Sequence, residues 1–422
     1  MQFKKTKLKN GLRVITAPVK GASTVMVLVA VETGSNYESK KENGLSHFLE
    51  HMCFKGTTKR TTASDIAKEL DGLGAANNAF TSNEMTGYYA RASKKHLPKL
   101  MDVVSDMYLN PTLPEEDLET ERGVILEEIS MYEDLPQKKV SHVLSKLLHG
   151  DTPSGRTILG PRENIKKFSR QDFVDYRSKH YVAGKTMVIV SGDVTEKEVL
   201  NLVNEHFSKI PREKILTKDK VLSSQKSPKL LVEYKKTDQA HMMLAFRAFG
   251  ARDKRMGALY MLAEILGQGM SSRLFNRLRE KMGACYYVRA RVHEYTDHGE
   301  LVIATGINSS RSEEVLKALL EECKNLVDEV VSDSELKKAK EHHIGHLYMD
   351  SETTDALALL ALEHEVVSGK LKTPKEIEKE IRKITAKDIQ KVAKEVFQNK
   401  NMNLAIIGDI KNKTKLKKAL KF

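Results

Sequence analysis

The apolar and polar residues of this chain follow the two periods that distinguish strands from helices. Strand-like runs lie at 26–31, 77–93 and 241–249, and the second run contains a turn. Apolar residues with helical spacing lie at 96–109 and 312–331. Strands and long helices therefore recur throughout the chain. This pattern predicts the α+β class, with mostly antiparallel sheets covered by helices.

The two halves of the chain repeat one pattern. In each half an amphipathic helix leads into an aliphatic strand that ends in Gly-Asp, at Asp193 and at Asp409. Between the halves, 209–228 is polar and rich in lysine, as expected of a linker. We predict two homologous domains joined by this linker, with the boundaries 1–208 and 229–422.

Composition narrows the classes of protein that fit. The 422 residues are 40% hydrophobic and 30% charged, which is typical of a folded, soluble protein. The net charge of +13 comes from dispersed lysines without a nucleic-acid-binding motif, so we expect no nucleic-acid partner. No apolar stretch approaches the roughly eighteen residues of a membrane span, and the three cysteines are too few for a disulfide framework. We expect a cytoplasmic protein that does not bind membranes.

A short helix predicted around residues 45–52 carries the candidate chemistry. Its apolar residues occupy one face, whereas His47, Glu50 and His51 occupy the other. Two imidazoles at i and i+4 can bind one tetrahedral Zn²⁺, and this spacing is the inverted zincin motif. We predict that His47 and His51 bind zinc. Glu50 would act as the base that takes a proton from zinc-bound water during peptide hydrolysis.

A catalytic zinc needs a third protein ligand, which the acidic helix at 117–136 can supply. Glu121 and Glu128 are two turns apart and share one face of this helix, whereas Glu127 points about 100° away. Helical geometry therefore favours Glu121 or Glu128 and does not choose between them.

The second half has lost this arrangement. When Gly257 is aligned with Gly44, Tyr260 takes the position of His47 and Glu264 that of His51. A separate pair, His342 and His346, also has i, i+4 spacing, with His343 between them. No acidic or histidine partner at ligand spacing is evident for this pair, so we expect no second metal site there.

Three separated motifs, HFLEH, ERGVILEEI and GRTILGP, make the chain resemble the pitrilysin family, which includes insulin-degrading enzyme and the mitochondrial processing peptidase. The resemblance covers essentially the whole chain. It implies that Glu128 is the third zinc ligand and that Glu121 supports the site without binding the metal.

The same resemblance implies two elements that bind substrate. The segment NNAFTS is similar to the family's edge strand, where the main chain at Asn78, Ala79 and Phe80 would pair with an extended peptide. The segment RLREKMGACYYV is similar to the family segment in which Arg279 and Tyr286 would hold the substrate backbone. The tyrosine hydroxyl could also stabilise an oxyanion.

The resemblance implies a zinc metalloendopeptidase that cleaves peptides or unfolded segments inside a closed chamber. Family chambers contain two halves, and this chain has the length of one half. We therefore expect a homodimer with two sites, with a heterodimer with a related chain as the alternative. Rival functions are a non-catalytic subunit related to the family and, more remotely, a basic nucleic-acid-binding protein.

Overall fold

A computed structural model describes residues 2–422, which form two compact units. Each unit contains three segments of the chain, whereas the sequence predicted one division at 209–228. Unit 1 contains 2–129, 156–219 and 349–373. Unit 2 contains 130–155, 220–348 and 374–422. The structure therefore exchanges 130–155 and 349–373 between the predicted domains. Residues 210–228 contain neither helix nor strand.

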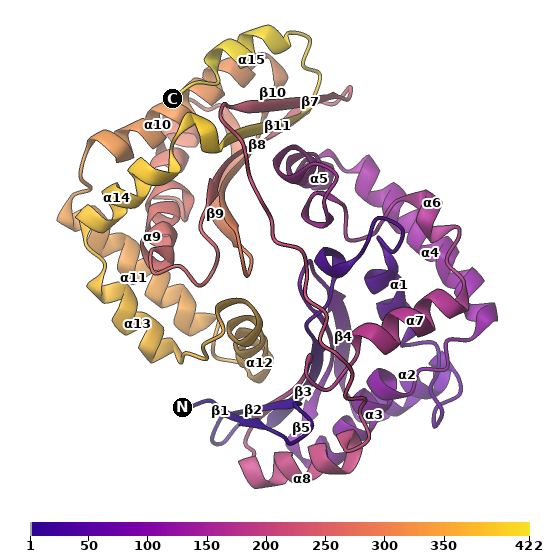
Figure 1. Cartoon of the computed structure of the whole chain (residues 1–422). Helices are drawn as coiled ribbons and strands as arrows, with labels where there is room; N and C mark the ends of the chain where they lie inside the picture. Colours follow the sequence, from indigo (N-terminus) through magenta and orange to yellow (C-terminus); the bar gives the residue numbers. More distant parts are fainter. Residues whose placement is uncertain (1) are drawn as a thin grey trace. The chain divides into compact units, whose positions relative to one another are not determined.

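Unit 1 contains a six-stranded sheet of order β1-β2-β6-β3-β5-β4. Figure 1 labels β1 to β5 of this sheet. The β2–β6 pair is parallel and the other pairs are antiparallel. Both β3 and β6 are buried almost throughout, which requires cover on both faces of the sheet. The strands are β1 Lys4–Lys7, β2 Arg13–Pro18, β3 Thr24–Val31, β4 Ala76–Thr81, β5 Thr86–Ser93 and β6 Thr186–Gly192.

Helices α3, α8 and α12 pack against this sheet. The helices of unit 1 are α1 Leu45–Met52, α2 Ala63–Gly72, α3 Leu97–Leu109, α6 Arg162–Ile165, α7 Arg170–His180, α8 Glu196–Phe207 and α12 Thr354–Glu363. Helix α4, Glu115–Asp134, begins in unit 1 and ends in unit 2. Short turns of 3₁₀-helix lie at Ser35–Tyr37 and Lys94–His96, and a π-helical turn lies at His364–Ser368.

Unit 2 repeats the strand arrangement, with the order β7-β11-β8-β10-β9 and one parallel pair, β7–β11. The remaining pairs are antiparallel, which confirms the predicted α+β class with mostly antiparallel sheets. The strands are β7 Lys229–Tyr234, β8 Gln239–Ala248, β9 Cys285–Glu294, β10 Gly299–Asn308 and β11 Met402–Gly408.

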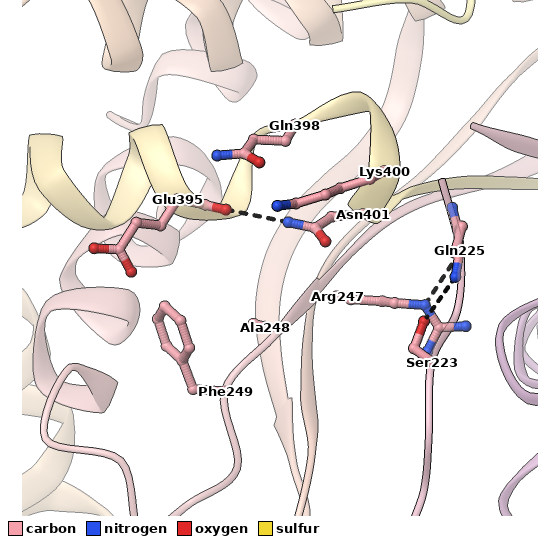
Figure 2. A pocket seen from close by; sticks show the side chains of 9 residues that line it. All are labelled: Ser223, Gln225, Arg247, Ala248, Phe249, Glu395, Gln398, Lys400 and Asn401. Atoms are coloured by element: carbon pink, nitrogen blue, oxygen red, sulfur yellow. Dashed lines mark hydrogen bonds between the residues drawn. The ribbon is translucent and has the colours of Figure 1, made fainter. Parts of the chain in front are cut away.

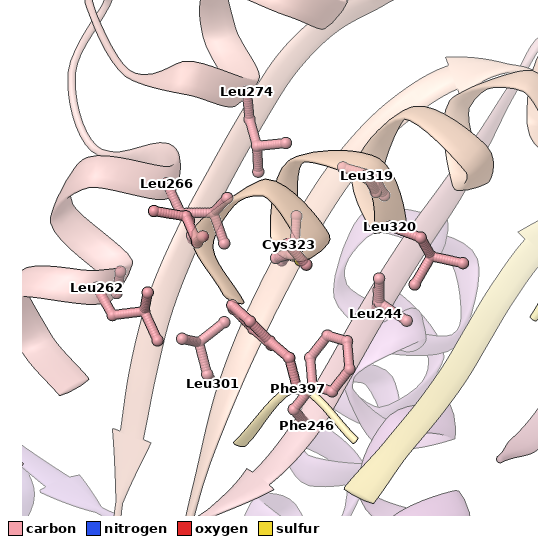
Figure 3. Packing of buried hydrophobic residues seen from close by; sticks show 14 of the residues in the cluster. Leu244, Phe246, Leu262, Leu266, Leu274, Leu301, Leu319, Leu320, Cys323 and Phe397 are labelled. Atoms are coloured by element: carbon pink, nitrogen blue, oxygen red, sulfur yellow. The ribbon is translucent and has the colours of Figure 1, made fainter. Parts of the chain in front are cut away.

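One face of this second sheet forms the core of unit 2 with α9, α10 and α14. Figure 3 shows Phe246 of β8 beside Phe397, with ring centroids 4.9 Å apart, and Cys323 of α10 in the same cluster. All three cysteines of the chain are free and buried. The helices of unit 2 are α5 Pro136–His149, α9 Met256–Gly267, α10 Ser312–Asp328, α11 Asp333–Met349, α13 Pro374–Lys383, α14 Ala386–Val396 and α15 Lys413–Ala419. The remaining short helical turns are Pro153–Gly155, Phe275–Lys281, Ser309–Arg311 and Asn399–Asn401.

The exchanged segments cover the second face of each sheet. In unit 2, α5 comes from the first half of the chain and packs Val140, Val143 and Leu144 against Ala245 and Ala405. In unit 1, α12 comes from the second half and packs on β2, β3 and β6. A sheet with two apolar faces must bury both, and these helices supply the missing layer. Among the described residues, no helix combines the length and apolar character that crossing a membrane requires.

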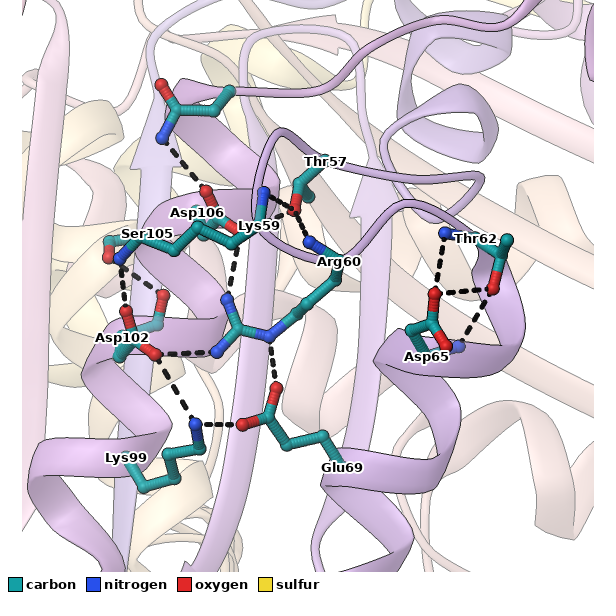
Figure 4. A network of polar contacts seen from close by, with 11 residues as sticks. Thr57, Lys59, Arg60, Thr62, Asp65, Glu69, Lys99, Asp102, Ser105 and Asp106 are labelled. Carbon is teal, nitrogen blue, oxygen red and sulfur yellow. Dashed lines mark hydrogen bonds and ion pairs between the residues drawn. The ribbon is translucent and has the colours of Figure 1, made fainter.

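A buried ion-pair network holds the loop that follows α1. Figure 4 shows the guanidinium of Arg60 at the centre of this network, between α2 and α3. Arg60 donates to Asp102 at 2.6 Å, to Asp106 at 2.8 Å and also to Glu69. Burial by itself would raise the pKa of Asp102, but hydrogen bonds from Lys59 and Arg60 hold it well below its ordinary value. The network fixes the chain just beyond the histidine-bearing helix.

Candidate metal centre

Helix α1 begins where two glycines meet. Gly44 precedes the helix with φ of 103°, a left-handed conformation that favours glycine. A Cβ atom on Gly44 would lie 3.0 Å from the Cα of Gly160 and 2.8 Å from the carbonyl oxygen of Leu159. The segment GRTILGP is therefore a packing partner of the zinc-motif helix, and both contacting positions require glycine.

Glu38 caps the first turn of α1, a role that the sequence analysis did not identify. Its buried carboxylate accepts hydrogen bonds from Asn43 Nδ2 at 3.0 Å, Gly44 N at 2.9 Å and Ser46 N at 2.7 Å. Burial raises the pKa of Glu38, although these hydrogen bonds oppose the rise. The cap satisfies backbone donors that no helical residue can satisfy.

The side chains of His47, His51 and Glu128 converge within unit 1. Glu128 Oε2 lies 3.6 Å from His47 Nε2 and 3.9 Å from His51 Nε2. Ligand atoms about 2.0 Å from a tetrahedral ion are about 3.3 Å apart, so these separations fit one zinc ion. Burial lowers the pKa of His47 to about 3, and the nearby His51 adds to this effect. His47 is therefore neutral at pH 7, as a metal ligand must be. Glu127 is exposed and takes no part.

Glu50 lies on the same helix and is also buried. Its Oε2 accepts a hydrogen bond of 2.6 Å from the hydroxyl of Thr81, the last residue of β4. Burial raises the pKa of Glu50, and the Thr81 hydrogen bond only partly offsets this. A carboxylate with a raised pKa is a stronger base, which suits a proton acceptor.

Glu121 connects the site to a lysine that sequence reasoning missed. Nδ1 of His51 donates to Glu121 Oε1 at 2.8 Å, which leaves Nε2 able to bind a metal. The other oxygen of Glu121 forms an ion pair with Lys55. The hydrogen bond from His51 holds the pKa of Glu121 down to about 2, assisted by Lys55. Lys55 follows His51 by four residues, so its spacing along the chain was the available signal.

The predicted substrate strand is the edge strand β4. Among the described strands it pairs with β5 alone, and Asn78 is exposed while Ala79 and Phe80 are half-buried. The free edge offers main-chain hydrogen-bonding groups to an extended peptide. Through Thr81 this strand also contacts Glu50.

Arg279 and Tyr286 lie together in unit 2. Arg279 donates to the carbonyl oxygen of Tyr286, and its guanidinium carbon lies 5.0 Å from the centroid of the tyrosine ring. Tyr286 is the extra residue of a β-bulge, because Tyr287 pairs with Gly306 and Cys285 with Ile307. A bulge redirects a side chain, and Tyr286 is 75% exposed. Its strand, β9, is the edge strand in the position that β4 holds in unit 1.

In the second half, Glu264 takes the aligned position of His51. It contacts histidines, whereas His51 contacts a glutamate. Glu264 of α9 accepts hydrogen bonds from Nδ1 of His342 at 2.5 Å and from Nδ1 of His343 at 3.1 Å. This acidic partner was not evident from spacing along the chain. Among the described residues, these side chains do not form a converging group of three possible ligands.

Two cavities of unit 2 lie apart from these residues. A cavity of about 470 Å³ is lined by Arg247, Gln225 and Asn401 among others (Figure 2). Arg247 Nε donates to Gln225 at 3.1 Å, and Asn401 donates to the main chain of Glu395 at 3.1 Å. A second cavity, of about 690 Å³, is bordered by Arg247 and His149.

Comparisons with known proteins identify the family of the chain. Residues 13–162, which include both histidines and Glu128, match the family model described as Insulinase (Peptidase family M16). Residues 167–342 match the Peptidase M16 inactive domain. An uncharacterized zinc protease of Bacillus subtilis, YmxG, is 32% identical over 96% of this chain and 98% of its own length. The chain belongs to peptidase family M16. This result confirms the predicted family.

Other M16 relatives cover the chain to a similar extent. Uncharacterized zinc proteases of Rickettsia felis and Streptomyces coelicolor are 32% and 31% identical over 96% and 97% of this chain, and 97% and 90% of their own lengths are covered. A protease from Helicobacter pylori has a similar fold, with a TM-score of 0.89 and 22% identity over 96% of this chain and 99% of that one. A Pseudomonas fluorescens structure titled peptidase M16 inactive domain has a TM-score of 0.90 and 17% identity over 97% and 98%. These relatives associate the chain with zinc peptidases at the level of the family.

Proposed function

We propose that this protein is a zinc metalloendopeptidase that hydrolyses peptides and unfolded segments. The observation that carries the proposal is the convergence of His47, His51 and Glu128 beside the buried carboxylate of Glu50. These three residues would hold Zn²⁺. When bound, zinc supplies a Lewis acid that polarises a carbonyl and acidifies water.

The other residues would bind the substrate and move its protons. A peptide would add to the edge of β4 by main-chain hydrogen bonds, with Thr81 holding Glu50 at the end of that strand. Glu50 would accept a proton from the attacking water and then donate it to the leaving amine. Arg279 and the exposed hydroxyl of Tyr286 would donate hydrogen bonds to substrate carbonyl groups.

We further propose that two copies of the chain enclose the substrate in a chamber, each supplying Arg279 and Tyr286 to the zinc site of the other. A pair with a related chain is the alternative. The arrangement requires that each chain carry both the zinc motif and the Arg279–Tyr286 pair, and this chain does. A closed chamber would restrict access to peptides and unfolded segments.

The substitution Glu50→Gln tests the chemistry directly. Glutamine keeps the size and the hydrogen bond with Thr81 but cannot accept a proton, so kcat for a quenched fluorescent peptide should fall by on the order of 10²–10⁴. Zinc content should remain that of the wild type. The matched control is Glu127→Gln, an exposed carboxylate on α4, which should leave both quantities unchanged.

Two outcomes would contradict the proposal. Normal cleavage by Glu50→Gln would remove Glu50 as the base. A wild-type chain that binds zinc but cleaves no member of a peptide library would favour the non-catalytic alternative, which the similarity to an inactive M16 domain keeps open.

A further inference from the structure

A second cluster of possible metal ligands lies in unit 2, apart from the zinc motif. His149 ends α5, His298 lies in the turn between β9 and β10, and Glu300 lies on β10. One ligand atom from each residue lies within 4.8 Å of the others. We propose that His149, His298 and Glu300 form a second site for a divalent transition metal, with zinc as the ion that their nitrogen and oxygen atoms suit best.

The burial of these residues favours a metal over an ordinary surface cluster. The side chains of His149 and Glu300 are only 3% and 5% exposed. Nε2 of His298 is buried and has no hydrogen-bond partner among the described residues. A buried polar atom without a partner destabilises the fold, and coordination of Nε2 of His298 would remove that cost.

The orientation of His298 matches that of a metal ligand. Its Nδ1 donates to Asp297 Oδ1 at 2.8 Å, which directs Nε2 away from the carboxylate. The same contact orients His51, whose Nδ1 donates to Glu121 at 2.8 Å. A carboxylate behind a ligating histidine fixes the ring and increases its basicity. Each cluster thus contains two histidines and one glutamate, and in each a further carboxylate accepts a hydrogen bond from one of the histidines.

Metal binding requires only a small change in the cluster. His149 Nε2 and Glu300 Oε1 are joined by a hydrogen bond of 2.7 Å, whereas ligand atoms of a tetrahedral zinc are about 3.3 Å apart. Binding would replace this hydrogen bond and separate the two atoms slightly.

The proposed ion would attach α5 to the sheet that it covers. Helix α5 comes from the exchanged segment 130–155 and packs on the sheet through Val140, Val143, Leu144 and Leu148. His149 follows directly after this apolar face, and the other two ligands belong to the β9–β10 hairpin. A metal at this point would stabilise unit 2, and water would occupy the fourth position.

Zinc stoichiometry tests the proposal when the first site is removed. Full-length wild type and a His47→Gln/His51→Gln variant are dialysed against zinc and analysed for metal. We expect about two ions per chain in the wild type and about one in the variant. Adding His298→Gln to the variant should remove the remaining ion. Adding His342→Gln, from the cluster on Glu264, should not.

Cobalt provides a readout that does not depend on zinc analysis. Cobalt bound in the His47→Gln/His51→Gln variant should give visible absorption, which Asp297→Asn should weaken by lowering metal affinity about 10–100-fold. This milder substitution answers the question if His298→Gln does not fold. One zinc per wild-type chain and none in the first-site variant would overturn the proposal. A remaining ion that persists after His298→Gln would overturn it as well.

Discussion

At the scale of single residues, Glu121 is proposed to support the zinc site without binding the metal. Its carboxylate accepts from Nδ1 of His51 and pairs with Lys55, but Glu128 is the carboxylate near both Nε2 atoms. We expect Glu121→Gln to lower zinc affinity about 10–100-fold, because the charge behind His51 is lost. Competition with a chelating indicator measures this affinity.

Glu119→Gln is the control for this substitution, since Glu119 lies on the same helix with a side chain that is 70% exposed. It should keep the zinc affinity of the wild type. Unchanged affinity in Glu121→Gln, together with a lower melting temperature, would show that Glu121 serves the fold alone.

His180 should make stability depend on pH. This histidine is 4% exposed, and burial, assisted by repulsion from Lys185, lowers its pKa to about 4. The pKa of histidine in an unfolded chain is about 6.5, so between pH 4 and pH 6.5 the unfolded chain binds more protons than the folded chain. The contribution of His180 to the free energy of unfolding is therefore complete above about pH 6.5. It is lost as pH falls towards 4, by about 3 kcal/mol in total.

The variant His180→Leu should lose this part of the pH dependence. Urea unfolding of zinc-free wild type and variant at several pH values between 7 and 4.5 measures the difference. If the free energy of unfolding fell equally in both proteins, His180 would not be the titrating group.

At the scale of elements, the loop after α1 depends on Arg60. Its side chain is 6% exposed and its guanidinium pairs with Asp106, whose side chain is 1% exposed. Arg60→Met would leave buried carboxylates without this cation and should lower the free energy of unfolding by about 3 kcal/mol. Lys59→Met is the control, because Lys59 is 55% exposed and its loss should cost under about 1 kcal/mol. Equal effects in urea unfolding would contradict this assignment.

The elements near the site were largely predictable because helical and strand periods are local. The i, i+4 spacing placed His47 and His51 on one face of α1. The two-turn spacing likewise placed Glu121 and Glu128 on one face of α4. Their carboxylates lie close to Nδ1 and Nε2 of His51, respectively. The choice between them needed tertiary distances, since helical periodicity does not specify where along its length α4 meets α1.

Other features could not be predicted from local pattern. The apolar faces of α5 and α12 show that these helices pack against another element, but they do not show which sheet that element is. The exchange of 130–155 and 349–373 is therefore a tertiary result. The bulge at Tyr286 leaves no clear sign in the sequence, because it depends on the pairing of β9 with β10. The capping of α1 by Glu38 likewise depends on how the loop before α1 folds, which a local pattern does not specify.

At the scale of the whole molecule, the proposed homodimer predicts complementation between two inactive variants. Glu50→Gln keeps Arg279 and Tyr286, whereas Arg279→Ala/Tyr286→Phe keeps the zinc helix. If each chain completes the site of its partner, a mixed dimer contains one intact site and one site with both defects. Random exchange of the two variants should then recover roughly a quarter of the wild-type activity per chain. Peptide cleavage before and after mixing measures this recovery.

The recovery is informative because its amount depends on which chain supplies each element. If Arg279 and Tyr286 acted on the zinc helix of their own chain, every site in a mixed dimer would retain one defect and mixing would restore nothing. A Glu50→Gln chain mixed with a Glu50→Gln/Tyr286→Phe chain is the control, since no combination of these chains contains an intact site. Mass measurement must show that mixed dimers form. Mixed dimers without recovered activity would contradict a shared site, and a fully active monomer at high dilution would contradict the homodimer itself.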